Sequence, residues 1–253
     1  MLFRAIGARS LVIILLLAST SANADVVRVA VASNFAGPAG DIAAQFEAQT
    51  GQAISLSTAS TGKLYAQIRA GAPFDVLLAA DERRPELLRR DGIATVTRVY
   101  AIGRLALVSA DPALSGSDCI AAFLSASSPT LAIANPATAP YGTAASAWLN
   151  EQPAVDGLRV ARGENVGQAM GFVVSGNARF GVVALSQLTA LQADWPGCAT
   201  ALPADSHPAV RQAAALLDGA GHSSAAAGFF EFLFSDKAVA TISSWGYATV
   251  EQP

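Results

Sequence analysis

The sequence predicts an α/β fold with two lobes, each a mainly parallel sheet flanked by helices, and a ligand cleft between the lobes. Three observations support this prediction. Apolar strand patterns alternate with helical patterns from residue 26 onward, which is typical of a parallel sheet covered by helices on both faces. A long apolar stretch at residues 99–109 then leads into a second alternating unit. Another apolar stretch, at residues 208–217, leads back to the first lobe.

The first lobe begins with three pairs of a strand and a helix. Its first strand, residues 26–32, is apolar almost throughout, as strands are when both faces of the sheet are buried. Gly51 and Gly71 each close a helical pattern. We expect further strands at residues 53–57 and 74–80, and helices at residues 38–49, after Gly62, and from the capping residue Asp81 to Gly92.

Two crossing strands connect the lobes. The stretch at residues 99–109 is longer than one strand needs and has Gly103 at its middle, so we interpret it as a strand that leaves the first lobe and enters the second. The stretch at residues 208–217 returns. The predicted boundaries are therefore residues 25–103 and 208–253 for lobe 1, and residues 104–207 for lobe 2.

The second lobe repeats the alternation of strands and helices. After a segment with a short helix, residues 111–128, the apolar periods resume. We expect strands at residues 131–134, 159–161 and 180–184, and helices at residues 143–150, 163–175 and 185–191, with two last helices of lobe 1 at residues 223–234 and 237–245.

Residues 1–24 have the features of a secretory signal peptide. Arg4 and Arg9 form a basic start, and residues 11–18 form a short apolar core. Ala22-Asn23-Ala24 is a small-x-small cleavage site. The apolar core is too short to anchor the chain permanently in a bilayer. We therefore expect cleavage near Ala24 and export to the periplasm.

Composition excludes several classes of function. The chain has 253 residues, of which 52% are apolar, and a net charge of −3. Its pI is about 5.3. Neither value favours binding to nucleic acid or to an anionic membrane surface. Any preference for anions must therefore come from local hydrogen-bond donors.

The chain has two cysteines, Cys119 and Cys198. An even pair in an exported protein is often a disulfide. The sequence cannot show whether the two lie close in space, so both a disulfide and two free thiols stay open. A catalytic thiol is disfavoured, because neither cysteine has a histidine nearby in the sequence.

The most informative short segment is Ser60-Thr61-Gly62-Lys63, where a strand turns into a helix. The first N–H groups of a helix have no internal partner and carry the positive end of the helix dipole. Such a corner can bind an anion with N–H groups and hydroxyls. The alternative is that Ser60 or Thr61 only caps the helix.

Four corners of this kind are predicted to face the cleft, because ligands of α/β sheets bind at the carboxyl ends of strands. All four are uncharged, and three add a hydroxyl or an amide. A shell of neutral donors suits a small, fully deprotonated oxyanion and disfavours one that still carries a proton. The corners are Ser33-Asn34, Ser60-Thr61-Gly62, Ala139-Pro140-Tyr141-Gly142 and Asn165-Val166-Gly167.

The motifs that could indicate catalysis or nucleotide binding are incomplete. Ser60-x-x-Lys63 matches part of the signature of penicillin-recognising hydrolases, but the Lys-Thr-Gly element is absent from the sequence. Gly62-Lys63 is not a P-loop, because Leu64 replaces the required Ser or Thr. His207 and His222 have no carboxylate at triad or metal-ligand spacing and are predicted to be surface residues. A periplasmic serine hydrolase using Ser60 and Lys63 is kept as the alternative from a different class.

These corners and their flanking segments resemble those of the periplasmic molybdate-binding proteins of ABC importers. The resemblance covers almost all of the mature chain and depends on the order of many segments. They are residues 29–35, 60–68, 71–81, 100–105, 133–136, 139–142, 165–169, 181–187 and 245–247.

The resemblance implies a type II periplasmic binding protein fold, no enzymatic activity and no cofactor. It implies a monomer that captures molybdate, and also tungstate, and delivers it to a membrane ABC permease; another tetrahedral oxyanion such as sulfate is the alternative ligand. Carried over by position, the oxyanion ligands are Ser33, Asn34, Ser60, Thr61, Tyr141 and, through its main-chain N–H, Val166.

The sequence departs from the resemblance at two positions. Some members have a tyrosine where this chain has Ala184, so that contact is absent. The chain is instead similar to the subgroup in which the tyrosine of the Ala-Pro-Tyr-Gly segment, here Tyr141, contributes to the site. Ser33 stands where relatives carry threonine, a change that keeps the hydroxyl.

Overall fold

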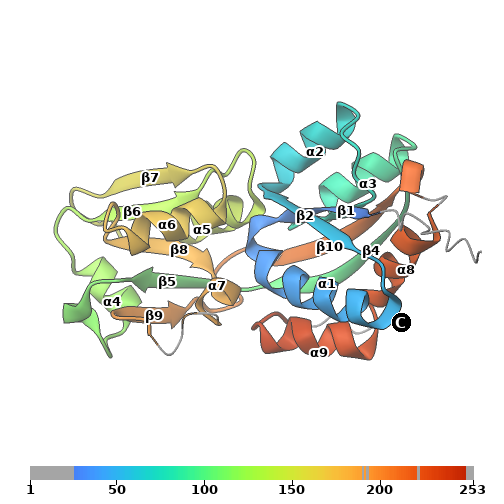
Figure 1. Cartoon of the computed structure of the whole chain (residues 1–253). Coiled ribbons are helices and arrows are strands. Elements are labelled where there is room, and N and C mark those ends of the chain that lie inside the picture. Colours follow the sequence, from blue (N-terminus) through green and yellow to red (C-terminus); the bar gives the residue numbers. More distant parts are fainter. Residues whose placement is uncertain (1–25, 190, 192–193, 221–222, 249–253) are drawn as a thin grey trace, which may run out of the picture.

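The structure is a computed structural model that describes residues 26–189, 191, 194–220 and 223–248. The predicted signal peptide and His222 lie outside these described residues. Two lobes lie side by side, each built on its own five-stranded sheet, and strands of the chain run between them (Figure 1). Within the described residues, none of the helices combines the length and the apolar character needed to cross a membrane.

The first sheet has the strand order β2-β1-β3-β10-β4. β1 pairs in parallel with β2 and with β3, whereas β10 is antiparallel to β3 and to β4. The sheet is therefore mixed, because β10 carries the chain back from the second lobe. The strands are β1 (Val27–Ala32), β2 (Ile54–Ala59), β3 (Val76–Leu78), β4 (Ala94–Gly103) and β10 (Val210–Leu217).

Helices cover both faces of this sheet. Alternate residues of a strand point to opposite faces, so β1 contributes Val29 and Val31 to one hydrophobic cluster and Ala30 to another. The first cluster includes Phe46 and Phe229. The helices on that face are α1 (Ala36–Thr50), α8 (Ser224–Phe232) and α9 (Asp236–Ser244), and those on the other are α2 (Thr61–Arg69) and α3 (Arg83–Arg90).

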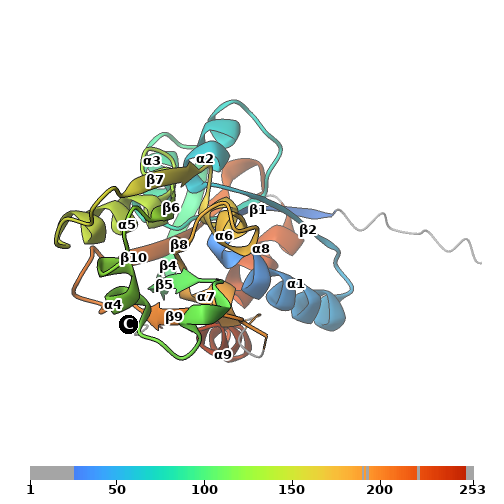
Figure 2. The same ribbon diagram turned by 90° about the vertical axis from the view of Figure 1, so that its left-hand side faces the viewer.

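The second sheet has the order β7-β6-β8-β5-β9 and is also mixed. β6 is parallel to β7 and β8, and β5 is antiparallel to β8 and β9. Figure 2 shows this lobe in front, with the first lobe behind it. Its strands are β5 (Leu105–Ser109), β6 (Thr130–Ala134), β7 (Arg159–Gly163), β8 (Phe180–Ala184) and β9 (Cys198–Ala201), and its helices are α4 (Cys119–Leu124), α5 (Pro140–Asn150), α6 (Val166–Val174) and α7 (Leu185–Thr189).

The predicted α/β class with two lobes and mainly parallel sheets is confirmed, and two details differ. One strand of each sheet, β10 in the first and β5 in the second, runs against the others. Strand β9 was not predicted, since Cys-Ala-Thr-Ala has neither a β-branched run nor apolar alternation. Helix α5 begins at Pro140, three residues earlier than predicted, because a proline fits the first position of a helix.

The first crossing is two strands joined at Arg104. β4 ends at Gly103 in the first sheet, and β5 begins at Leu105 in the second. A Cβ atom at Gly103 would lie 2.1 Å from the hydroxyl of Tyr141, so only glycine fits where the chain passes between the lobes. Because β10 pairs with β4 in the register Val210 to Gly103, both crossings meet at this point. We propose the lobe boundaries given by the sequence, after residues 103 and 207.

Candidate functional site

The four predicted corners meet around one small cavity between the lobes. The space left between them is about 10 Å³, close to what one water molecule requires. Residues of β1, α2, α5 and α6 surround it, so both lobes contribute. The lining residues are Ala32, Ser33, Asn34, Ser60, Thr61, Ala80, Ala139, Pro140, Tyr141 and Val166.

Thr61 is the first residue of α2, and 1% of its surface is exposed. Its hydroxyl accepts a hydrogen bond of 3.0 Å from the main-chain N–H of Ala80. Since that bond occupies an acceptor position of the oxygen, the hydroxyl proton remains to be donated. The structure thus presents Thr61 to the cavity as a donor.

Ser60 precedes α2 and has an extended backbone, with φ −68° and ψ 148°. This is the conformation of a capping residue, but its side chain makes no capping hydrogen bond within the described chain. Its hydroxyl is buried and has no hydrogen-bond partner among the described residues. A buried hydroxyl without a partner is costly, so Ser60 is placed for a partner that the chain itself does not supply.

Asn34 directs its side chain away from the cavity. Its Nδ2 donates to Gln212 Oε1 at 2.9 Å and to the hydroxyl of Tyr247 at 3.0 Å. Asn34 lies in the single-turn helix η1 (Ser33–Phe35), which follows β1 directly. Its main-chain N–H is therefore the group that can serve the cavity. Ser33, beside it, is half-buried and lines the same cavity.

Tyr141 also turns its side chain away. Its hydroxyl accepts a hydrogen bond of 3.3 Å from Gln212 Nε2. Because Pro140 occupies the first position of α5 and has no N–H, the N–H of Tyr141 is the first donor at this helix start. The sequence indicated Tyr141 without specifying which of its groups contributes. In the structure, the group that can donate to a ligand in the cavity is the main-chain N–H.

Val166 begins α6 and completes the ring of donors. The side chain of Asn165 caps this helix by accepting from the N–H of Gln168 at 3.0 Å. The cap accepts from Gln168 and not from Val166. The N–H of Val166 can therefore donate to a ligand in the cavity, because no carbonyl of the helix can reach it. The helix starts of α2, α5 and α6 therefore all contribute to the cavity, with the positive ends of three helix dipoles.

The ten lining residues are all uncharged. Ion pairs lie around them instead. Lys63 Nζ is 2.5 Å from Glu164 Oε2, and this pair joins the two lobes. Arg211 Nε is 3.1 Å from Glu82 Oε2. In the described part of the chain, no group of three or more His, Cys, Asp or Glu side chains could hold a metal ion.

Direct hydrogen bonds hold the lobes together around the cavity. The N–H of Gly62 donates to the carbonyl oxygen of Thr138 at 2.8 Å. A Cβ atom at Gly62 would lie 2.8 Å from the same oxygen, so this approach requires glycine. On another side, Ser186 Oγ donates to the carbonyl oxygen of Asn34 at 3.0 Å. The structure therefore shows the closed arrangement of the lobes.

Sequence reasoning missed a buried polar cluster behind the cavity. It consists of Asn34, Tyr100, Tyr141, Ser186, Gln212 and Tyr247, with exposures of 5% or less. Burial raises the pKa of Tyr247 to about 12, so the cluster is uncharged at neutral pH. A signal was available: Gln212 is an isolated amide within the apolar stretch that forms β10.

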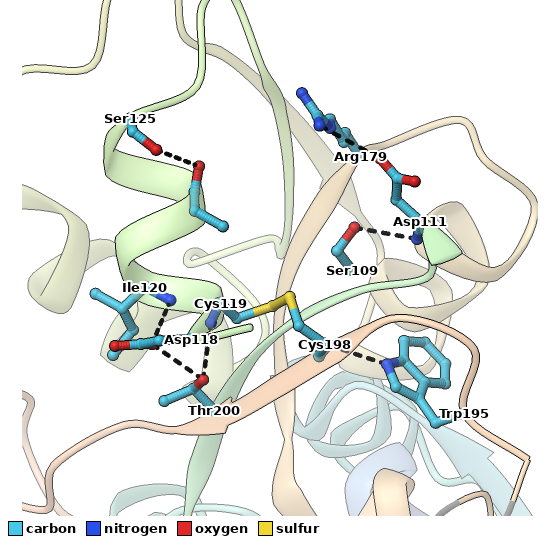
Figure 3. The surroundings of a disulfide bond; sticks show 11 residues. Ser109, Asp111, Asp118, Cys119, Ile120, Ser125, Arg179, Trp195, Cys198 and Thr200 are labelled. Atoms are coloured by element: carbon cyan, nitrogen blue, oxygen red, sulfur yellow. Dashed lines mark hydrogen bonds and ion pairs between the residues drawn. A yellow bond between two sulfur atoms is a disulfide. The ribbon is translucent and has the colours of Figure 1, made fainter. Parts of the chain in front are cut away.

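The structure joins Cys119 and Cys198 as a disulfide, with their Cα atoms 5.4 Å apart (Figure 3). It ties the first residue of α4 to the first residue of β9. Hydrogen bonds flank it, from the N–H of Cys119 to Thr200 Oγ1 and from Trp195 Nε1 to the carbonyl of Cys198. Neither cysteine lines the cavity.

Comparisons with known proteins agree with this geometry. Residues 27–248 match the family described as bacterial extracellular solute-binding protein. The molybdate-binding protein ModA of Azotobacter vinelandii is 39% identical over 235 residues, covering 91% of this chain and 93% of that protein. ModA of Rhodobacter capsulatus is 35% identical over 247 residues, or 96% of each chain. The solved periplasmic molybdate-binding protein of Azotobacter vinelandii superposes with a TM-score of 0.79 at 34% identity, covering 89% of this chain and all of that one.

Proposed function

Because the chain belongs to the family of bacterial extracellular solute-binding proteins, we propose that it is a binding protein whose solute is molybdate, with tungstate as a second ligand. Tungstate is included because the two ions have nearly the same size and charge. The buried, unpartnered hydroxyl of Ser60 is the observation that carries the proposal. An anion in the cavity would give this hydroxyl an acceptor.

The neutral lining sets the class of anion. Ser33, Ser60 and Thr61 offer hydroxyl protons, and three helix or turn starts offer main-chain N–H groups. No carboxylate or other anionic acceptor is present among the ten lining residues. An oxyanion that still carried a proton would leave that proton without a good partner, which is costly in a buried site. The site therefore favours a fully deprotonated, tetrahedral oxyanion.

The mechanism that we propose is capture without chemistry. The hydroxyls of Ser33, Ser60 and Thr61 and the N–H groups of Asn34, Tyr141 and Val166 bind the oxyanion, and the lobes close over it. A tetrahedral oxyanion is larger than a water molecule, so the groups that line the present cavity of about 10 Å³ would move outward slightly to hold it. The closed form is then presented to an ABC permease after export to the periplasm.

The serine hydrolase alternative receives no support from the geometry. A hydrolase would need Lys63 as a neutral base close to Ser60. Lys63 instead pairs with Glu164 on the other lobe. The side chain of Lys63 also does not line the cavity into which Ser60 faces.

Calorimetric titration with molybdate, tungstate and sulfate in parallel tests the proposal. We expect one-to-one binding of molybdate and tungstate, and much weaker binding of sulfate, because sulfate is smaller and the donors are fixed by helix starts. Binding of sulfate alone would keep the cavity but overturn the ligand. No heat with any of the three anions would overturn the oxyanion site itself.

A further inference from the structure

Gln212 is a buried amide at the point where the chain returns from lobe 2 to lobe 1. It lies on β10, and its exposure is 0%. The register of β10 against β4 shifts between Gln212 and Ala213, so the strand is irregular at this residue. A polar group in such a position is costly unless its atoms are hydrogen-bonded. Its partners therefore indicate its role.

The two ends of the amide bind different lobes. Oε1 accepts from Asn34 Nδ2 at 2.9 Å and from the hydroxyl of Tyr100 at 3.1 Å, both in lobe 1. Nε2 donates to the hydroxyl of Tyr141 in lobe 2 at 3.3 Å. Glutamate would lack the donor, and leucine would lack both groups. An amide of this length is thus suited to bridge the lobes here.

Two further side chains strengthen the same junction. The hydroxyl of Tyr247 lies 2.7 Å from the carbonyl oxygen of Asn34 and 3.0 Å from Ser186 Oγ. Ser186 belongs to α7 in lobe 2 and itself donates to the carbonyl of Asn34. The carbonyl oxygen of Asn34 is therefore bonded by side chains of both lobes, while its N–H remains available to the cavity.

Two of the residues held by Gln212, Asn34 and Tyr141, also line the cavity. The bonds from Gln212 to Tyr141 and from Ser186 to Asn34 join the lobes, and we expect both to break when the lobes separate. We propose that Gln212 is a positioning residue: it stabilises the closed lobes and, through Asn34 and Tyr141, aims their main-chain N–H groups at the anion. This inference rests on the proposed function, because it places an oxyanion in the cavity.

The rival explanation is that Gln212 only satisfies buried hydroxyls and has no part in closure. The two explanations differ for Tyr100 and Tyr141, which are both buried and both bond to Gln212. The bond to Tyr100 lies within lobe 1 and persists when the lobes separate. The bond to Tyr141 crosses between the lobes and is lost. Only the second can change the affinity for a ligand that requires closure.

The test compares Tyr141→Phe with its matched control Tyr100→Phe, since each removes one hydroxyl. Calorimetry gives the Kd for molybdate, small-angle scattering gives the degree of closure, and scanning calorimetry gives the Tm of the ligand-free protein. We expect Tyr141→Phe to raise the Kd roughly fivefold to tenfold and to reduce closure at saturation. Tyr100→Phe should lower the Tm and change the Kd by less than about twofold.

Equal changes in Kd for the two variants, or an unchanged Kd for Tyr141→Phe, would overturn the inference. If Tyr141→Phe fails to fold, Ser186→Ala provides the same test, because it removes the bond from Ser186 to the carbonyl of Asn34, which also joins the lobes, and it too should raise the Kd. If the wild-type protein binds molybdate and the two variants show the same Kd, the role of Gln212 is rejected and the proposed function stands. A wild-type protein that takes up no molybdate would reject the proposed function and this inference with it.

Discussion

The cavity is lined by ten uncharged residues, whereas the rim around it carries the ion pairs Lys63–Glu164 and Glu82–Arg211. Ser60 and Thr61 in the cavity are at most 2% exposed. The side chains of Lys63 and Glu164 are 50% and 57% exposed. A buried hydrogen bond to an ion is worth more than a solvent-exposed ion pair, because water screens the pair and competes for it.

This difference shows how a protein of net charge −3 can select an anion. Donors that are buried and fixed at helix starts need no formal charge to attract an oxyanion. A cationic side chain buried in the empty cavity would be costly, because it would have no anion to pair with. Neutral donors avoid that cost. The comparison predicts large effects for changes in the cavity and small effects for changes at the rim.

The largest effect is expected for Thr61→Val, which keeps the shape of the side chain and removes its hydroxyl. The anion loses a donor, at a cost of about 2–3 kcal/mol in binding, or roughly 30-fold to 150-fold in Kd. The N–H of Ala80 also loses its acceptor, which should lower the free energy of unfolding by about 1–3 kcal/mol. Calorimetry with molybdate and urea unfolding measure the two effects separately. Unchanged affinity would remove Thr61 from the site.

Ser60→Ala should have a smaller total effect, because Ser60 has no partner among the described residues to lose. We expect the Kd for molybdate to rise about tenfold or more. The free energy of unfolding of the ligand-free protein should be unchanged or slightly higher, since a buried unpartnered hydroxyl is removed. Ser125→Ala is a matched control, as its exposed hydroxyl bonds to the carbonyl of Ala121 on α4. Loss of stability without loss of affinity would contradict the assignment of Ser60.

A second contrast, between the corners of the cavity and the cluster around Gln212, explains which parts of the structure were predictable. The corners at Ser60 and Asn165 were visible because strand and helix periods change there, and such changes are local features of sequence. The cluster around Gln212 was not, because it joins Asn34, Tyr141 and Tyr247, which are far apart in the chain. Strand β9 was missed for a similar reason: it pairs with β5, whose strand lies about 90 residues earlier.

Local reasoning also cannot decide which group of a residue faces a ligand. Asn34 and Tyr141 were both predicted to contribute to the site, and both line the cavity. Their side chains, however, bond to Gln212 behind it. That orientation depends on where β10 returns, which is a property of the topology. The pairing of Lys63 with Glu164 likewise depends on how the two lobes meet.

The smallest effect is expected at the rim, for Lys63→Met. This change removes the ion pair with Glu164 and keeps most of the apolar stem of the side chain. Because both partners are about half exposed, a pair of this kind contributes about 0–1 kcal/mol, and the Kd for molybdate should change less than about fivefold. The pair can still affect the rates of opening and closing, and that effect should shrink as salt is raised. Stopped-flow measurement of molybdate release at low and high salt, on Lys63→Met, Glu164→Gln and the double variant, isolates the coupling between the two charges. A coupling as large as the loss caused by Ser60→Ala would show that the rim, and not only the neutral cavity, determines affinity.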